Sequence, residues 1–198
     1  MKERGMIFNG AMVRALLDGR KTQTRRPVNP QPELTAGSGF SWKGWVYGSG
    51  SSDLETNKNF AHAACPFGKP GDRIWVRETW AEAGASAPDL KLYRANYPAH
   101  VPTHYENVPP AEGVRWTPSI HMPRWASRIL LEITSVRVER LRSMSQDDAR
   151  AEGVIAASGP MEAGLAFREL WDSIYGVESW GANPWVWVIE FKRIEEKS

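Results

Sequence analysis

The chain has 198 residues, of which 24% are charged, a formal net charge of +2 and one cysteine, Cys65. A chain of this length can bury a sizeable core and most often forms one domain. The single cysteine excludes an internal disulfide framework, and the small net charge does not by itself indicate nucleic-acid binding. Because the sequence has neither a signal-peptide hydrophobic region nor an apolar run of about 18 residues, we expect a cytoplasmic protein without a membrane partner.

The first predicted elements are a short strand at Met6–Phe8 and a short amphipathic helix at Asn9–Leu17. Asn9 is the expected N-cap, and Gly19 ends the helix. The apolar stripe that predicts this helix consists of Met12, Val13, Leu16 and Leu17.

Directly after this helix, four cations and two hydroxyls occur within ten residues, namely Arg20, Lys21, Arg25 and Arg26 with Thr22 and Thr24. In one interpretation, Arg20 and Lys21 only complement the negative end of the helix dipole and remain solvated. In the other, the neighbouring positive charges lower the pKa of Lys21 in a partly buried loop. A neutral amine beside the Thr24 hydroxyl would then place a base next to a nucleophile.

The middle of the chain contains two stretches of weak periodicity. Residues 28–68 are rich in Pro, Gly, Ser and Asn and are expected to form a long insertion loop. A turn at Lys69–Asp72 precedes an alternating strand at Arg73–Glu78, and a further strand is expected at Leu90–Ala95. Residues 96–118, with their many prolines, predict a second irregular excursion.

The C-terminal part predicts two long strands with helices between them. The first strand spans Arg128–Arg140, and a change of phase near Thr134 or Ser135 indicates a β-bulge. Ser145 caps a short helix that ends before Gly153, and a second helix is expected at Met161–Tyr175. With a closing strand at 184–194, this order suits an α+β domain around a mostly antiparallel sheet that can close into a barrel.

Glu152 falls in the last turn of the short helix capped by Ser145. A carboxylate there faces the negative end of the helix dipole, which costs stability and gives the group the character of a general acid. The alternative is a solvated glutamate paired with Arg150 or a nearby lysine.

Several segments together resemble the ASCH domain family, whose fold is PUA-like. They are the Gly19-Arg20-Lys21-Thr22 motif with Thr24 and Arg26, the Pro-Gly-Asp turn before a strand at 70–76, the stretch from Leu141 to Glu152, and Val188-Ile189-Glu190-Phe191-Lys192. The resemblance implies a single domain over 1–198 with insertions at about 28–68 and 81–127. The segments at 69–80 and 121–128 are similar to those of the long ASCH proteins of phages and prophages.

Within this family, small bacterial acetylcytidine amidohydrolases use a lysine, a threonine and a glutamate to remove an acetyl group from the exocyclic amine of cytidine. The resemblance places these residues at Lys21, Thr24 and Glu152. It implies Lys21 as base, Thr24 as nucleophile and Glu152 as the acid that protonates the leaving amine, with no cofactor and no metal. Arg26 would orient the substrate or stabilise the oxyanion, or would form a structural salt bridge.

A second function remains open, because other ASCH proteins are nucleases or proposed RNA binders. In a noncatalytic module that binds RNA or DNA or recognises a modified base, the basic residues would contact single-stranded nucleic acid. The candidates are Arg20, Arg25 and Arg26 in the first basic segment, and Arg124 and Arg128 around a stacking Trp125 in the second. Arg25 departs from the family pattern, which has an apolar residue at this position.

Overall fold

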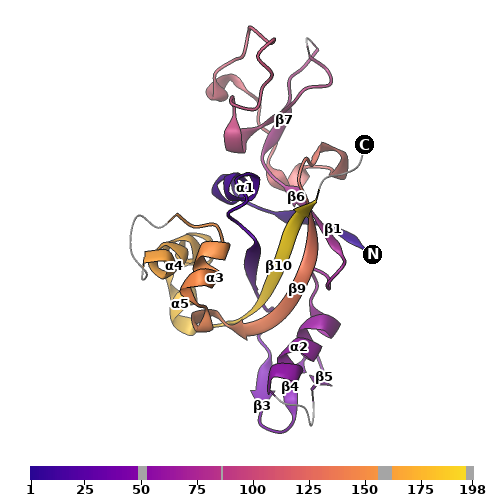
Figure 1. Ribbon diagram of the computed structural model, residues 1–198, viewed down its shortest axis with the longest axis vertical. Coiled ribbons are helices and arrows are strands. Elements are labelled where there is room, and N and C mark those ends of the chain that lie inside the picture. The colour runs from indigo at the N-terminus through magenta and orange to yellow at the C-terminus, as the bar shows by residue number, and fades with distance from the viewer. Residues whose placement is uncertain (49–52, 86, 156–161, 195–198) are drawn as a thin grey trace.

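The computed structural model describes residues 1–48, 53–85, 87–155 and 162–194, and its main feature is a curved sheet. Among these residues the sheet has five strands (Figure 1), in the order β1 (Glu3–Ile7), β6 (Arg73–Arg77), β9 (Leu130–Arg140), β10 (Trp185–Ile194) and β2 (Gln23–Pro27). β1 and β6 are parallel, whereas the other neighbours are antiparallel. The predicted α+β class is confirmed at this level: a mixed sheet with a few helices.

Helix α1 (Gly10–Leu17) follows β1 as the sequence predicted. The Asn9 side chain accepts a hydrogen bond of 2.9 Å from the backbone N–H of Met12 and so caps the helix. Gly19 has a φ of +73°, a conformation that glycine adopts without steric cost, and it turns the chain toward β2.

Strands β9 and β10 form the longest ribbon of the sheet. Ser135 pairs with Glu190 and Ile133 pairs with Phe191, so Thr134 is the extra residue of a bulge, as predicted. Along β10 the side chains alternate between two cores. Trp185, Trp187 and Ile189 join the larger cluster, whereas Val186 and Val188 face the cluster formed with the C-terminal helices.

The C-terminal helices gather beside the β9–β10 ribbon (Figure 1). They are α3 (Gln146–Ala151), α4 (Glu162–Tyr175) and α5 (Val177–Ala182), and the 3-10 helix Leu141–Ser143 precedes them. The predicted N-cap at Ser145 is confirmed, since Ser145 and Asp148 form a reciprocal capping box. Helix α5 was not predicted; it begins directly after Gly176, whose φ is +85°.

The expectation of a long irregular loop at 28–68 is wrong. This stretch forms a three-stranded antiparallel sheet, β3 (Glu33–Thr35), β4 (Gly39–Trp42) and β5 (Trp45–Tyr47), followed by helix α2 (Asp53–Ala64). Aromatic packing accounts for the order: the Phe40 and Phe60 rings stack at 4.7 Å, and both lie within 5.0 Å of a β10 tryptophan, Trp185 or Trp187. Because these contacts are nonlocal, the polar composition of the segment did not reveal them.

The second excursion lies at the opposite end of the long axis from α2 (Figure 1). It contains the strand pair β7 (Trp80–Glu82) and β8 (Lys91–Tyr93), and short 3-10 helices at Arg94–Asn96, Ala111–Gly113, Ser119–His121 and Arg124–Ala126. In the part of the chain that the structure describes, no helix has the length and apolar character needed to cross a membrane.

Candidate active site

The turn after α1 places Lys21 beside the end of α3. The backbone N–H of Lys21 donates to the Ala15 carbonyl (3.0 Å), and that of Thr22 donates to the Ala151 carbonyl (2.8 Å). Gly153 permits this close approach, because a Cβ at that position would lie 2.8 Å from the Lys21 Cβ. The glycine that ends α3 therefore lets residues 131 positions apart in sequence meet.

Lys21 and Glu152 form a buried ion pair. The Lys21 Nζ donates to the Glu152 Oε2 (2.8 Å) and to the Glu152 backbone carbonyl (2.9 Å), and the two residues are only 3% and 2% exposed. Burial lowers the pKa of Lys21 below its ordinary value, and the charges of Arg26 and Arg25 add to this effect while Glu152 opposes it. The expected direction is confirmed, but burial is the main cause rather than the neighbouring charge.

Arg25, predicted to bind the substrate or nucleic acid, points into the protein. Its Nη1 donates to the Glu152 Oε1 (3.1 Å), and its Nη2 donates to Glu139 (2.6 Å) and lies 3.4 Å from the Asp148 carboxylate. Arg25 is 3% exposed, so its guanidinium faces carboxylates of the protein. Glu152 thus has two cationic partners, one on each carboxylate oxygen.

Thr24 shares a small cavity with Glu152. Thr24 is 1% exposed, and the cavity has a volume of ≈ 10 Å³, room for about one water molecule. Within the described residues, the structure gives the Thr24 hydroxyl no hydrogen bond to Lys21 or Glu152. The structure therefore brings Lys21, Thr24, Arg25 and Glu152 into one neighbourhood without a direct contact from the hydroxyl.

A larger cleft of ≈ 430 Å³ reaches Glu152 from the surface between α1 and α4. Met12, Leu170 and Glu152 line both this cleft and the small cavity, so they separate the two spaces. Lys21 is not among the residues that line either space. Glu152 is consequently the member of the predicted triad that faces the open cleft.

The other cations of the first basic segment are held by the protein. Arg20 pairs with Asp18 (2.8 Å) and donates to the Gly153 carbonyl (2.6 Å) at the rim of the cleft. Arg26 donates to the Ile7 carbonyl (2.8 Å), and its guanidinium carbon lies 5.5 Å from the centre of the Phe8 ring. Both arginines thus fix the surroundings of the Lys21–Glu152 pair.

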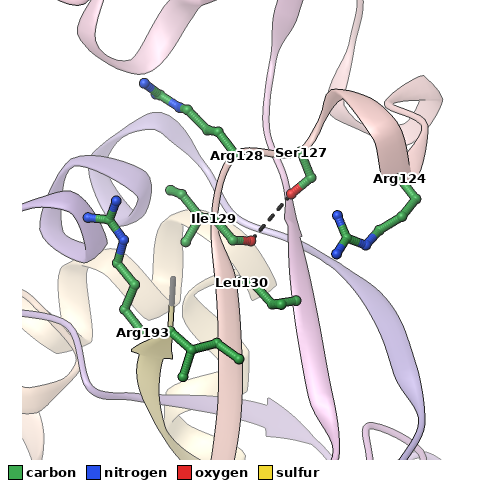
Figure 2. A pocket seen from close by; sticks show the side chains of 7 residues that line it. Arg124, Ser127, Arg128, Ile129, Leu130 and Arg193 are labelled. Atoms are coloured by element: carbon green, nitrogen blue, oxygen red, sulfur yellow. Dashed lines mark hydrogen bonds between the residues drawn. The ribbon is translucent and has the colours of Figure 1, made fainter. Parts of the chain in front are cut away.

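The second basic segment lines a different cavity, of ≈ 340 Å³, with Arg193 (Figure 2). Arg128 forms a two-point ion pair with Glu78 (2.9 and 3.0 Å), and Arg124 pairs with Glu3 (3.0 Å). Trp125 is 59% exposed and lies edge-on against Trp80. Figure 2 shows Arg124 and Arg193 on opposite sides of the Ser127–Leu130 segment. These residues share no lining position with the cavities at Glu152.

The sequence interpretation missed the role of Asp148, although the capping box at Ser145 was a local signal for it. Burial raises the pKa of Asp148, but hydrogen bonds from Ser145 and Gln23 and the charge of Arg25 outweigh burial and hold the pKa below its usual range. Asp148 also accepts from Arg137 at 2.9 Å. It therefore links the cap of α3 to Arg25, and through Arg25 to Glu152.

Comparison of the chain with models of protein families, with curated proteins and with solved structures finds no match in any of the three. Across the ranges that the structure describes, no group of three or more His, Cys, Asp or Glu side chains is arranged to hold a metal ion.

Proposed function

We propose that this protein is a hydrolase that removes an acyl group from the exocyclic amine of a modified nucleoside or nucleic-acid base. The observation that carries the proposal is the buried contact of 2.8 Å between the Lys21 Nζ and Glu152, next to the cavity that Thr24 lines. A base and an acid that exchange protons must lie within about 2.6 to 3.2 Å of each other or be joined by one water. The resemblance to the acetylcytidine amidohydrolases of the ASCH family supports the same three residues.

In the proposed reaction, neutral Lys21 accepts the proton of the Thr24 hydroxyl while the Thr24 oxygen attacks the amide carbonyl carbon. The Lys21 proton passes to Glu152 across their contact, and Glu152 delivers it to the nitrogen of the leaving amine as the carbon–nitrogen bond breaks. Water then hydrolyses the acyl ester on Thr24 and releases the carboxylic acid. The lowered pKa of Lys21 supports the first step, because it increases the fraction of neutral amine.

Arg25 supports this mechanism by balancing charge. When Lys21 is neutral, the buried Glu152 carboxylate would be left without a counterion if Lys21 were its only partner, and such a charge is costly. Arg25, 3.1 Å from the other carboxylate oxygen, provides a permanent counterion. We therefore assign Arg25 as a positioning residue rather than a contact to phosphate.

Substrate entry requires the boundary between the two spaces to open. Thr24 is enclosed, and Met12 and Leu170 stand with Glu152 between its cavity and the open cleft. Both are unbranched at Cβ and can change rotamer without moving the backbone. We propose that the acylated base enters between α1 and α4 and displaces these two side chains.

A PUA-like barrel is part of the proposal. The order of the five-stranded sheet ends at β1 and β2, and Arg26 of β2 donates to the Ile7 carbonyl at the end of β1. This side-chain bridge between the two terminal strands supports a closed arrangement.

The test is incubation of the protein with a panel of nucleosides that carry different acyl groups on the exocyclic amine, with release followed by chromatography. We expect hydrolysis of at least one member and a loss of at least tenfold in rate for Glu152→Gln. The surface variant Arg115→Gln serves as the control, since Arg115 is exposed and lines none of the cavities described above. No release from any member of the panel would contradict the proposal.

The alternative is a noncatalytic module that binds RNA or DNA. Such a module has no need for a lysine and a carboxylate that converge in a buried site, and Arg25, Arg26 and Arg128 are all engaged by protein groups. The hydrolase therefore accounts for more of the site.

A further inference from the structure

Another cavity adjoins the Glu152 cleft at Arg14. Its volume is ≈ 310 Å³, within the range typical of small-molecule sites, and its lining consists of Gly10, Arg14, Glu78, Thr79, Arg94 and Ala95. Arg14 also lines the cleft that reaches Glu152, so the two cavities meet at this residue. The sequence interpretation assigned no role to either Arg14 or Arg94.

Within the described part of the chain, the two arginines that line this cavity have no acidic partner. Arg94 is exposed, and across the described ranges its guanidinium makes no ion pair or hydrogen bond. Arg14 is also exposed and uses one nitrogen to donate to the Ala95 carbonyl at 2.8 Å, which leaves its other N–H groups available. This differs from Arg20, Arg25, Arg124 and Arg128, each of which pairs with a carboxylate.

The carboxylate in the cavity is already neutralised. Glu78 is 2% exposed, and Arg128 holds both of its oxygens while also donating to the Asn96 side chain at 2.9 Å. Arg128, which does not line the cavity, therefore neutralises Glu78. Arg14 and Arg94 do line the cavity, and among the residues that the structure describes neither has a carboxylate partner. This arrangement favours an anion, and arginine pairs geometrically with the oxygens of a phosphate.

We propose that this cavity binds a phosphate group attached to the ribose of the substrate, through Arg94 and Arg14, while the acylated base occupies the cleft at Glu152. The substrate is then a nucleotide, either as a monophosphate or within a single strand, rather than a free nucleoside. The assignment of the base to the Glu152 cleft rests on the proposed function. Phosphate binding by Arg94 does not depend on hydrolysis and is measured separately.

The experiment measures the dissociation constants of three ligands by calorimetry or fluorescence anisotropy: an acylated cytidine nucleoside, its monophosphate, and a short single-stranded oligonucleotide that contains it. Wild-type protein should bind the phosphate-bearing ligands at least tenfold more tightly than the nucleoside. Arg94→Gln should remove most of this gain and leave nucleoside affinity unchanged, whereas the control Arg115→Gln, which makes the same change of charge in the same excursion, should retain the gain. Preference for the oligonucleotide over the monophosphate, with affinity that falls as salt rises, identifies a strand as the substrate; the reverse order identifies a mononucleotide.

Equal affinity for nucleoside and phosphate-bearing ligands, or an unchanged gain in Arg94→Gln, would overturn the inference. So would equal losses in Arg94→Gln and Arg115→Gln, because that would reflect net charge rather than a site. If the phosphate-dependent gain is present but no ligand is hydrolysed, the phosphate site stands and the proposed function fails.

Discussion

Glu152→Gln should destabilise the protein more than any other single change at the site, because it removes the carboxylate that lies between Lys21 and Arg25. Arg25 keeps Glu139 (2.6 Å) and Asp148 (3.4 Å), whereas the buried Lys21 ammonium loses the carboxylate that it contacts. Both side chains are fully buried, with 0% of their side-chain surface exposed. At 2.8 Å, a pair of unit charges attracts by about 6 kcal/mol at an effective dielectric constant of about 20, before the cost of desolvation is subtracted. Breaking a buried pair by removing one partner costs about 3 to 5 kcal/mol, so we expect a loss in this range for Glu152→Gln.

Lys21→Met should cost less, since Arg25 remains as a counterion to Glu152 at 3.1 Å. In the double variant the two losses should not add, and the sum of the two single losses should exceed the loss in the double variant by about 1 to 3 kcal/mol. Urea denaturation at neutral pH gives the free energy of unfolding of all four proteins. The exposed pair between Arg20 and Asp18, also at 2.8 Å, supplies the control, and Asp18→Asn should cost less than about 1 kcal/mol. Additive losses, or a loss for Glu152→Gln no larger than that for Asp18→Asn, would refute this account of the pair.

Three further predictions concern pH and capping. Because the pKa of Lys21 in the folded protein lies below 10.5, the unfolded chain binds more protons than the folded protein between the folded pKa and pH 10.5. The free energy of unfolding of the wild type should therefore rise with pH in that window relative to that of Lys21→Met. Urea denaturation at several pH values measures both curves, and parallel curves would contradict the prediction. Arg25→Met removes a charge that lowers the pKa of Lys21, so the rise of hydrolysis rate with pH should move to higher pH, and an unmoved profile would exclude coupling between the two residues. Asp148→Asn should lower the free energy of unfolding by about 2 kcal/mol at neutral pH, because it weakens the hydrogen bonds that Asp148 accepts from Ser145 and Arg137. The loss should shrink as the pH falls below 3.8, because the lowered pKa of Asp148 stabilises the fold fully only above pH 3.8. A loss that persists in acid would indicate packing instead.

The sequence predicted elements well where local signals set them. Asn9 and Ser145 capped their helices as expected, and the change of phase in the strand at 130–140 identified the bulge at Thr134. The prediction from sequence failed where contacts between distant segments determine the local structure. The order of residues 28–68 depends on aromatic contacts such as Phe40 with Trp185, which no local pattern encodes.

At the candidate site, too, the sequence predicted some of the residues and missed others. The segments that resemble the family identified Lys21 and Glu152, which form an ion pair, and Thr24, which shares a small cavity with Glu152. The sequence could not tell that Arg25 faces inward, because that direction depends on carboxylates from β9 and α3, Glu139 and Asp148. Arg14 and Arg94 belong to no motif, and only the fold brings α1 beside the 3-10 helix Arg94–Asn96, where Arg14 donates to the Ala95 carbonyl.

The initial rate of acyl release by Lys21→Met and Thr24→Val, on a substrate that the wild type hydrolyses, tests the central claim most directly. Thr24→Val keeps the shape of the side chain and removes the hydroxyl, and Lys21→Met keeps most of the length and removes the amine. Both variants should bind the substrate nearly as tightly as wild type and lose at least about tenfold in rate, because the two groups act in the transition state. Rates equal to wild type in both variants would contradict a hydrolytic centre at Lys21, Thr24 and Glu152, whereas full activity in Thr24→Val alone would replace the covalent step by attack of water that Lys21 activates.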